Sequence, residues 1–455
     1  MLGLANIIKY KPLTLLYILL SSVLYFWFAY DLERTEAVKL VLLYVVLFIF
    51  AFQIIKSTGF YFRILVGAAI LFRFLFLLAL PNLSQDFYRF IWDGTMILEG
   101  FNPYLYAPNT VITWNPSIPL ATELHGGMGE LSAQHFTNYP PINQLCFVIG
   151  NLFPGKGILS SVIGMRLLII SADIGTLYFG KKLLEVLKLP SNRIFWYILN
   201  PFIIIEFTGN LHFEGVMLFF LIWSLYLLHS GKWKWAALVF ACSVSVKLIP
   251  LMFLPLFFWW FVKKDKIMAG LKQLTLFYTI VCLSIVLLFS PFFSMAFITN
   301  YAETVGLWFG NFEFNASIYY ILREIGFSIT GYNEIQTISK ILPVITLLSI
   351  LGLAFLQQNN DFKTLASSML LAFTIYLFLS TTVHPWYIST LVLLCMFTSY
   401  RFPLVWSLVI ILSYLAYLGI GTSEKSENLW IISLEYLLVY AAFLWEVVFK
   451  KKITV

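Results

Sequence analysis

Charged residues are scarce in this 455-residue chain, since only 11% of its residues are Asp, Glu, Lys or Arg whereas 60% are apolar. A soluble protein of this length covers its surface with roughly a quarter charged residues. Because this chain has too few, lipid must solvate most of it. The shortage excludes a soluble enzyme, a disordered scaffold and a nucleic-acid-binding protein, and it makes the lipid bilayer the first expected partner.

Cysteine is also scarce. The chain has four cysteines, all in apolar segments and none in a Cys-x-x-Cys motif: Cys146, Cys242, Cys282 and Cys395. This pattern is typical of small apolar packing residues rather than of a metal site or a disulfide framework.

Long apolar runs are what the chain has in abundance. The first, 12–30, follows Lys9 and Lys11 and is long enough to span a bilayer, so it predicts a retained helix rather than a cleaved signal peptide. The other runs are 38–56, 61–80, 158–180, 194–208, 212–230, 234–247, 250–262, 268–290, 338–357, 363–381, 386–400, 402–419 and 429–449. They predict an all-α polytopic membrane protein with about 12–14 spans, forming a single integral-membrane domain over 1–455.

The basic residues predict the orientation of the chain. If the N-terminus is cytoplasmic, most of the 29 Lys and Arg residues fall on the cytoplasmic side, as the positive-inside rule requires. Both termini, including Lys451 and Lys452, are then cytoplasmic, and the basic net charge is a topology signal. Two long segments, 81–157 and 291–337, lie outside. Long irregular segments are usually functional, so chemistry is expected at the extracytoplasmic face beneath 81–157.

The first polar motif follows a membrane exit. Asp86 stands at the boundary between apolar and aqueous residues, and Arg89 shares its side of a helix predicted over 86–98. The other face is apolar and consists of Phe87, Phe90, Ile91 and Leu98. This arrangement is typical of an amphipathic helix lying on a membrane. A helix cap with an ordinary i,i+3 pair is the alternative.

A second motif gathers polar groups at one outer turn after Asn200-Pro201. Glu206, His212 and Glu214 lie close to hydrocarbon, where polar groups are costly and tend to be functional. A solvated turn is the alternative. Nearby, Arg166 and Asp173 share one face of a span, which predicts a structural pair.

Two further motifs lie at outer helix ends. Lys247 precedes Pro250 between two short apolar stretches, and a cation at the end of a broken helix suits a phosphate ligand. Snorkelling of Lys247 to the headgroups is the alternative. In His384-Pro385-Trp386-Tyr387, an aromatic belt at the interface explains the Trp and Tyr but not the His.

In this order, the motifs resemble those of the GT-C superfamily of integral-membrane glycosyltransferases. The resemblance is carried by Asp86, Gly-x-Asn-Pro-Tyr at 100–104, Tyr139-Pro140-Pro141, Asn200-Pro201 with Glu206 and His212-Phe213-Glu214, Lys247 with Pro250 and Pro255, and His384-Pro385-Trp386-Tyr387. Within the superfamily, the chain is most similar to bacterial polyprenyl-phosphate-mannose-dependent mannosyltransferases. It is more distantly similar to the first mannosyltransferase of GPI-anchor assembly.

The resemblance implies an inverting transfer of a hexose, with mannose favoured, from a polyprenyl-phosphate donor to a hydroxyl of a glycan, lipid or protein. It places the enzyme in a bacterial inner or plasma membrane. Asp86 matches the first-loop carboxylate that acts as general base, and Arg89, Lys247 and His384 occupy donor-phosphate positions. The resemblance also implies substrate-binding positions at Tyr88, Asn102, Tyr139, Glu206, His212, Glu214, Trp386 and Tyr387.

One residue departs from the family pattern. Many relatives carry Asp-x-Asp in the first loop, whereas Tyr88 stands at the second position here. Because Lys, Arg and His can neutralise a single phosphate, we expect a metal-independent enzyme without cofactors. Glu206 and Glu214 remain alternative ligands for a divalent cation.

Two other classes of protein compete with this interpretation. A transporter or flippase for lipid-linked saccharides should hold its substrate groups near the bilayer midplane, whereas the candidate groups here collect at one face. A lipid-binding accessory protein would not need Asp86.

Overall fold

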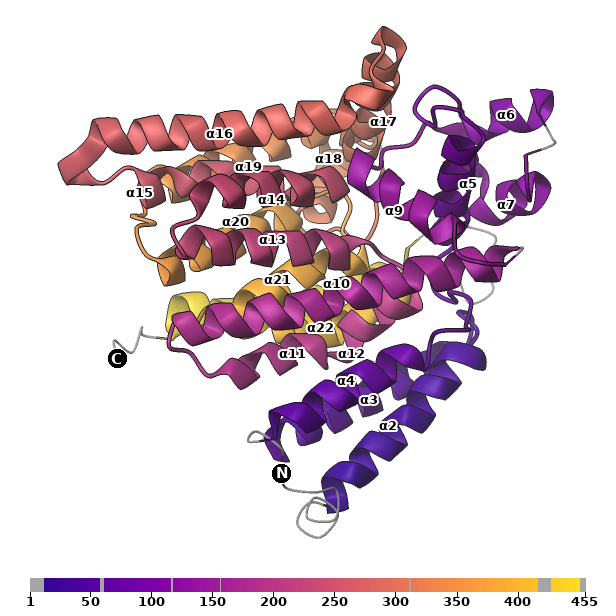
Figure 1. Cartoon of the computed structure of the whole chain (residues 1–455), viewed down its shortest axis with the longest axis horizontal. Helices are drawn as coiled ribbons and strands as arrows, with labels where there is room; N and C mark the ends of the chain where they lie inside the picture. Colours follow the sequence, from indigo (N-terminus) through magenta and orange to yellow (C-terminus); the bar gives the residue numbers. More distant parts are fainter. Residues whose placement is uncertain are drawn as a thin grey trace.

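A computed structural model describes residues 12–57, 61–115, 118–155, 157–310, 312–415 and 427–450, except for the side chains of 308–310. Lys9, Lys11, Lys451 and Lys452, used above to orient the chain, lie outside the described residues. Within these ranges all regular structure is helical, apart from one isolated bridge between Phe314 and Thr382. The prediction of an all-α polytopic membrane protein is confirmed (Figure 1).

Seven helices in the described part of the chain are long and apolar enough to cross a membrane. They are α2 (Pro12–Tyr30), α3 (Ala37–Ser57), α10 (Ile158–Val186), α16 (Ile267–Phe289), α19 (Ile335–Phe355), α20 (Phe362–Leu379) and α23 (Leu429–Leu444). The short turns η4 (Lys264–Lys266), η5 (Ser290–Phe292) and η8 (Trp445–Phe449) extend α16 and α23.

Other apolar runs form broken or shorter helices. The run after Asn200 forms α12 (Pro201–Ile203) and the π-helical turn η2 (Ile204–Gly209), which meets α13 (Glu214–His229) at 116° and gives an eighth span if the pair is counted as one. The shorter helices are α4 (Phe62–Phe74), η1 (Ser191–Ile194), α11 (Phe195–Ile198), α14 (Trp233–Val246), η3 (Ile249–Phe257) with α15 (Phe258–Phe261), η6 (Pro385–Ile388) with α21 (Ser389–Cys395), and α22 (Phe402–Val409) with η7 (Ile410–Leu415).

Proline explains why there are fewer long helices than the 12–14 predicted spans. Pro201, Pro250, Pro385 and Pro403 each stand in the first turn of a new helix, where a missing N–H costs little. Pro201 divides the predicted run 194–208, and the other three stand where the runs 250–262, 386–400 and 402–419 begin, which form only shorter helices.

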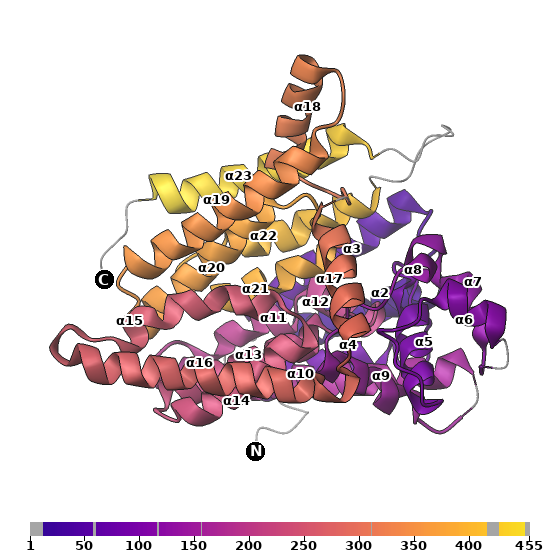
Figure 2. The ribbon, with the colours of Figure 1, turned by 90° about the horizontal axis from the view of Figure 1, so that it is seen from above.

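The two segments predicted to lie outside contain their own helices. Segment 81–157 forms α5 (Asp86–Leu98), α6 (Pro108–Trp114), α7 (Ala121–Met128), α8 (Glu130–Gln134) and α9 (Pro141–Asn151), which gather at one end of the bundle (Figure 1). Segment 291–337 forms α17 (Met295–Gly310) and α18 (Ile318–Thr330), and α18 projects from the bundle when seen from above (Figure 2). The Nδ2 of Asn300 donates to the carbonyl of Tyr104 over 3.0 Å, so the two segments are bonded together.

The helix predicted over 86–98 is confirmed as α5. Its apolar side chains pack inside the protein rather than facing lipid, because α9 covers them: the Phe90 and Phe147 rings stack with centroids 4.7 Å apart. Phe87, Phe90 and Ile91 are buried, and only Leu98 at the end of the helix is exposed. The packing of α5 against α9 therefore fixes the position of the residues at the start of α5, including Asp86.

The predicted pair between Arg166 and Asp173 is wrong. Asp173 instead accepts a hydrogen bond from the Nε of Arg73 on α4 over 2.7 Å, with both side chains buried. Arg166 donates to four carbonyl oxygens, those of Leu77, Ala79, Thr208 and Gly209. Sequence spacing showed the shared helix face but could not show that another helix supplies the partner of Asp173.

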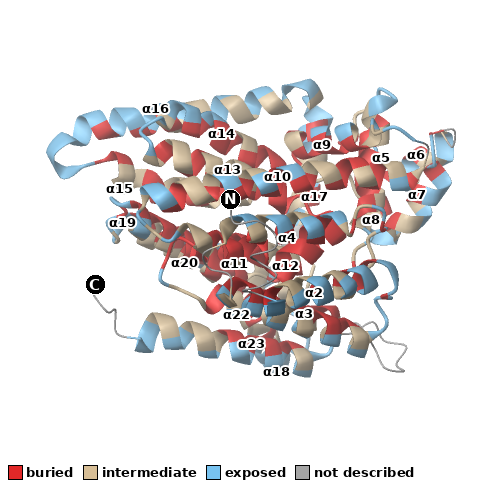
Figure 3. Cartoon of the chain, turned by 60° about the horizontal axis from the view of Figure 1, so that its bottom comes forward, coloured by how far each residue is buried: buried red, intermediate tan, exposed pale blue. Residues whose placement is uncertain are grey.

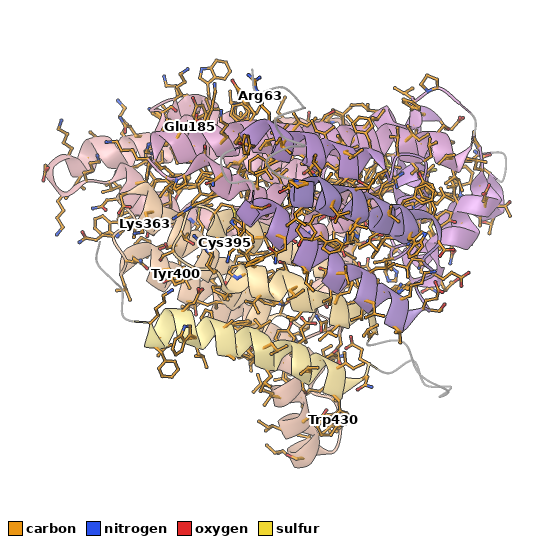
Figure 4. All side chains as sticks on the ribbon, turned by 90° about the horizontal axis from the view of Figure 1, so that it is seen from below. Arg63, Glu185, Lys363, Cys395, Tyr400 and Trp430 are labelled. Atoms are coloured by element: carbon orange, nitrogen blue, oxygen red, sulfur yellow. The ribbon has the colours of Figure 1, made fainter. Side chains whose placement is uncertain are left out.

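Burial falls from the middle of the helix bundle to its outer helices. Buried residues concentrate in the middle of the bundle, whereas outer helices such as α16 and α18 present exposed apolar side chains (Figure 3). Glu185, Lys363 and Tyr400 lie toward the end of the bundle away from α5–α9 (Figure 4). The predicted orientation of the chain in the membrane stays a prediction.

Candidate active site

A cavity of about 790 Å³ lies beneath the 81–157 segment. Its wall contains seven residues that the sequence predicts at the site: Asp86, Arg89, Tyr139, Lys247, His384, Trp386 and Tyr387. The sequence therefore identified residues from distant parts of the chain that the fold brings to one cavity.

Asp86 is the first residue of α5, where the helix dipole favours a carboxylate. Its backbone N–H donates to the Oγ of Ser84 over 3.3 Å. Burial raises the pKa of Asp86 above its ordinary value, while the charge of Lys247 opposes that rise and the charge of Glu214 adds to it. A raised pKa brings a carboxylate closer to the range in which a general base works well.

Lys247 lies where one helix breaks before the next begins. α14 ends at Val246, Lys247 has extended backbone, and η3 begins at Ile249 with Pro250 in its first turn. The ammonium Nζ is 3.1 Å from Oε1 of the fully buried Glu214 and 4.9 Å from the centre of the Tyr139 ring. Glu214 and Tyr139 therefore hold the ammonium at the cavity wall.

Arg89 is buried and mostly occupied by other contacts. Its Nε donates to Oδ1 of Asp93 over 2.8 Å, and its Nη1 donates to the carbonyls of Ser132 and His135. Its Nη2 has no hydrogen-bond partner among the described residues. Arg89 therefore lines the cavity with most of its guanidinium engaged by the protein and with Nη2 buried.

Three stacked rings form another part of the site. The Trp386 ring lies nearly parallel to the rings of His212 and His384, with centroids 3.7 and 4.6 Å away. These short separations leave no room for both imidazoles on one face, so the indole is covered on both. Burial and Lys247 lower the pKa of His384 to about 3, so at neutral pH His384 offers a hydrogen bond rather than a charge.

Glu206, His212 and Glu214 lie behind the cavity wall rather than on it. The Tyr414 hydroxyl donates to Glu206 over 2.8 Å, and His212 Nε2 is 3.5 Å from the same carboxylate. Glu214 pairs with Lys247 as described above. These three residues support the wall, and their predicted substrate contacts stay predictions.

Tyr88 and Asn102 also lie away from the cavity wall. Tyr88 packs against Gly127 of α7, where an added Cβ would come within 2.5 Å of its ring. Asn102 bonds within its own turn, to the N–H of Tyr104, and donates to the carbonyl of Phe292 over 3.2 Å. The structure thus shows both residues in structural contacts.

Arg34 and Tyr414 are among the cavity residues that the sequence did not predict. Arg34, in the turn between α2 and α3, lines the cavity with its guanidinium 5.7 Å from the centre of the Tyr414 ring. Arg34 could have been found, because it is a cation on the side where the positive-inside rule expects few. Tyr414 gave no signal, because it lies in an apolar run rich in aromatic residues.

The sequence of this chain matches a known protein family. A family model described as "Alpha-(1->6)-mannopyranosyltransferase, N-terminal domain" matches residues 17–263, which is more than half of the chain. The chain belongs to this family. Comparison with curated proteins gives no match.

The family relationship confirms the resemblance to a GT-C mannosyltransferase, and it makes this chain a membrane-embedded glycosyltransferase. The matched residues include Asp86, Arg89 and Lys247 and end before His384. Among the described residues, no group of three His, Cys, Asp or Glu side chains could hold a metal ion. Metal independence of the mannosyltransferase stays a prediction.

The raised pKa of Asp86 predicts the pH dependence of the mannosyltransferase. If Asp86 acts as the general base, it must be deprotonated, so kcat/KM should fall as pH drops through a pKa above the ordinary value of about 3.9 for aspartate. Because Lys247 lowers this pKa, the acid limb should move to higher pH in Lys247→Ala. Initial rates from pH 4 to 9 at subsaturating donor would check both results, and an unmoved limb in the variant would contradict the assignment of the limb to Asp86.

Proposed function

We propose that this mannosyltransferase moves a mannosyl group from a polyprenyl-phosphate donor to an acceptor hydroxyl, with inversion, at the extracytoplasmic membrane face. The observation that carries the proposal is the presence of Asp86, Lys247 and His384 in the wall of one cavity. A carboxylate with a raised pKa and a fixed cation are the two groups that displacement of a phosphate by a hydroxyl requires.

The proposed chemistry is a single displacement. The acceptor oxygen attacks C1 of the sugar, the bond from C1 to the phosphate oxygen breaks, and the electron pair of that bond stays with the phosphate. Asp86 takes the acceptor proton. Lys247 stabilises the phosphate dianion that leaves, assisted by the positive charge of Arg89 and a hydrogen bond from His384. Since one displacement inverts C1, an α-linked product such as the family description names requires a β-linked donor.

A second cavity supports a lipid-borne donor. It has a volume of about 400 Å³ and is lined mainly by apolar residues of η3, α19 and α20. Met252, Tyr376 and Ser380 line both this cavity and the first, so the two adjoin. A phosphate beside Lys247 would have apolar space next to it for the first part of a prenyl chain.

The test of the function is a donor panel with purified protein. We expect release of polyprenyl phosphate from the β-linked mannosyl donor, in the presence of an acceptor and of excess EDTA. The α-linked donor and nucleotide-linked mannose should be inert. Turnover of the nucleotide sugar alone would refute a polyprenyl-phosphate donor, and strict dependence on magnesium would refute metal independence.

The adjoining apolar cavity gives a prediction about chain length. Thr346→Trp should fill part of it and raise the KM for a long-chain donor by roughly tenfold, since losing contact with two CH₂ groups costs about 1.6 kcal/mol. A donor with a much shorter chain should lose less. Leu348→Trp is the matched control, because Leu348 lies on the same helix with 62% of its surface exposed. Equal losses with both donors would remove this cavity from the donor site.

A further inference from the structure

The backbone beside His384 is paired with a distant segment, 312–315. The N–H of Phe314 donates to the carbonyl of Thr381 over 3.1 Å, and the N–H of Val383 donates to the carbonyl of Phe314 over 2.8 Å. The Thr382 hydroxyl also donates to the carbonyl of Phe312 over 2.8 Å. The residues immediately before His384 are therefore fixed by segment 312–315.

The aromatic side chains of this segment reach His384 itself. The Phe314 ring lies within 29° of parallel to the imidazole with centroids 5.1 Å apart, and the Phe312 ring is 6.1 Å away at a similar angle. Together with Trp386, these rings restrict the tilt of the imidazole. A neutral imidazole bonds a phosphate through one nitrogen in one direction, so this tilt decides whether the bond forms.

Asn315 anchors the segment to the C-terminal part of the chain. Its N–H donates to Oε1 of Glu427 over 2.9 Å, its Nδ2 donates to Glu435 over 3.2 Å, and its carbonyl accepts from the Tyr436 hydroxyl over 2.7 Å. Asn315 is fully buried, and its φ of 46° is a left-handed conformation that Asn tolerates better than most residues. Three separate bonds therefore fix the residue that follows Phe314.

Glu313 provides a second anchor on the other side. It accepts hydrogen bonds from the Tyr319 hydroxyl, from Nη1 of Arg323 over 2.6 Å and from Nδ2 of Asn333 over 2.7 Å. Along this segment, the aromatic side chains contact His384 and the polar side chains bond the surrounding scaffold. None of the segment lies in the region that matches the family, which ends at residue 263.

We propose that Asn315 is a positioning residue that holds Phe314 against His384 and so orients the imidazole toward the donor phosphate. The inference rests on the proposed role of His384 in binding the donor. Bonds between Asn315 and α23, far from the reacting atoms, would then change donor affinity by changing the orientation of the His384 imidazole. Loss of the anchor should therefore raise the donor KM more than it lowers kcat.

A double-mutant cycle tests the proposal with the full-length protein. Asn315→Gly keeps the left-handed backbone and removes the bond to Glu435, and it should lower kcat/KM for the donor by roughly tenfold. In a His384→Ala background, the same change should cost less than about twofold, because the ring to be oriented is gone. Tyr436→Phe removes the bond to the Asn315 carbonyl and a hydrogen bond with Ser317 but keeps the ring, so it should fold and show a smaller loss with the same dependence on His384.

Asn359→Ala is the matched control, because Asn359 is another fully buried asparagine bonded to two carbonyls, those of Leu256 and Leu353. Any loss it causes should be the same with and without His384. A full tenfold loss for Asn315→Gly in the His384→Ala background would overturn the positioning role, as would full donor affinity in both Asn315→Gly and Tyr436→Phe. If His384→Ala alone leaves the donor KM unchanged, the donor role of His384 fails first, and the inference fails with it.

Discussion

Asp86→Asn is expected to lower kcat by roughly a hundredfold or more, because the amide keeps the size of the side chain but cannot accept the acceptor proton. Donor binding should survive, since Lys247 and the other proposed phosphate contacts are unchanged. The thermal unfolding midpoint should not fall, because burial disfavours the charge that the substitution removes. Single-turnover assays with radiolabelled donor, together with donor binding to the same preparation, would separate chemistry from binding.

Glu99→Gln is the control for this prediction. Glu99 follows the last residue of α5 and is exposed, so its amide variant changes the same net charge without altering the cavity. Its kcat should stay within about twofold of the unmodified enzyme, as is usual for an exposed surface change. If Asp86→Asn behaved like Glu99→Gln, another group would have to accept the proton.

Lys247→Ala is expected to weaken donor binding by about ten- to a hundredfold. A charge-assisted contact contributes about 1.5–3 kcal/mol, and each 1.4 kcal/mol corresponds to a factor of ten. The variant should also lower the unfolding midpoint, because it leaves Glu214 buried without its cation. Lys247→Arg should recover part of the affinity, since the charge survives in a different geometry. Titration of the β-linked donor would measure the affinities of both variants, and thermal unfolding would measure the midpoint.

The double variant Lys247→Ala with Glu214→Gln separates binding from stability. Removing the unpaired carboxylate should restore much of the unfolding midpoint but little of the donor affinity. Lys340→Ala, which removes an exposed cation outside both cavities, should change neither. Unchanged donor affinity in Lys247→Ala would assign Lys247 a purely structural role beside Glu214.

The parts of the site that could be predicted from sequence carry local signals. The bounds of α5 follow from the polar-to-apolar change at Asp86 and the spacing of its apolar residues. The position of Lys247 follows from Pro250, because a proline and the residues just before it disfavour continuation of an α-helix, and α14 ends at Val246. In both cases the backbone conformation is determined by residues only a few positions away in the sequence.

The parts that could not be predicted depend on partners from other helices. Arg166 shares a helix face with Asp173 in sequence, but Asp173 pairs with Arg73 of α4, a hundred residues away. Glu206 and Glu214 both resemble ligand-binding carboxylates in sequence, yet one binds Tyr414 and the other Lys247 behind the wall. Asn315 has no distinguishing neighbours in sequence, because its partners lie more than a hundred residues away.

The two imidazoles that cover Trp386 have a consequence for how sugars are told apart. Carbohydrate sites commonly lay the apolar side of a pyranose flat on an indole, a contact that hardly distinguishes one epimer from another. Here an imidazole stacks on each face of the indole, which leaves less of either face for a sugar. Selection of mannose would then depend on hydrogen bonds to individual hydroxyls, above all the axial one at C2 that separates it from glucose. Such an enzyme should distinguish the two hexoses by hydrogen bonds to their hydroxyls rather than by apolar contact with the sugar ring.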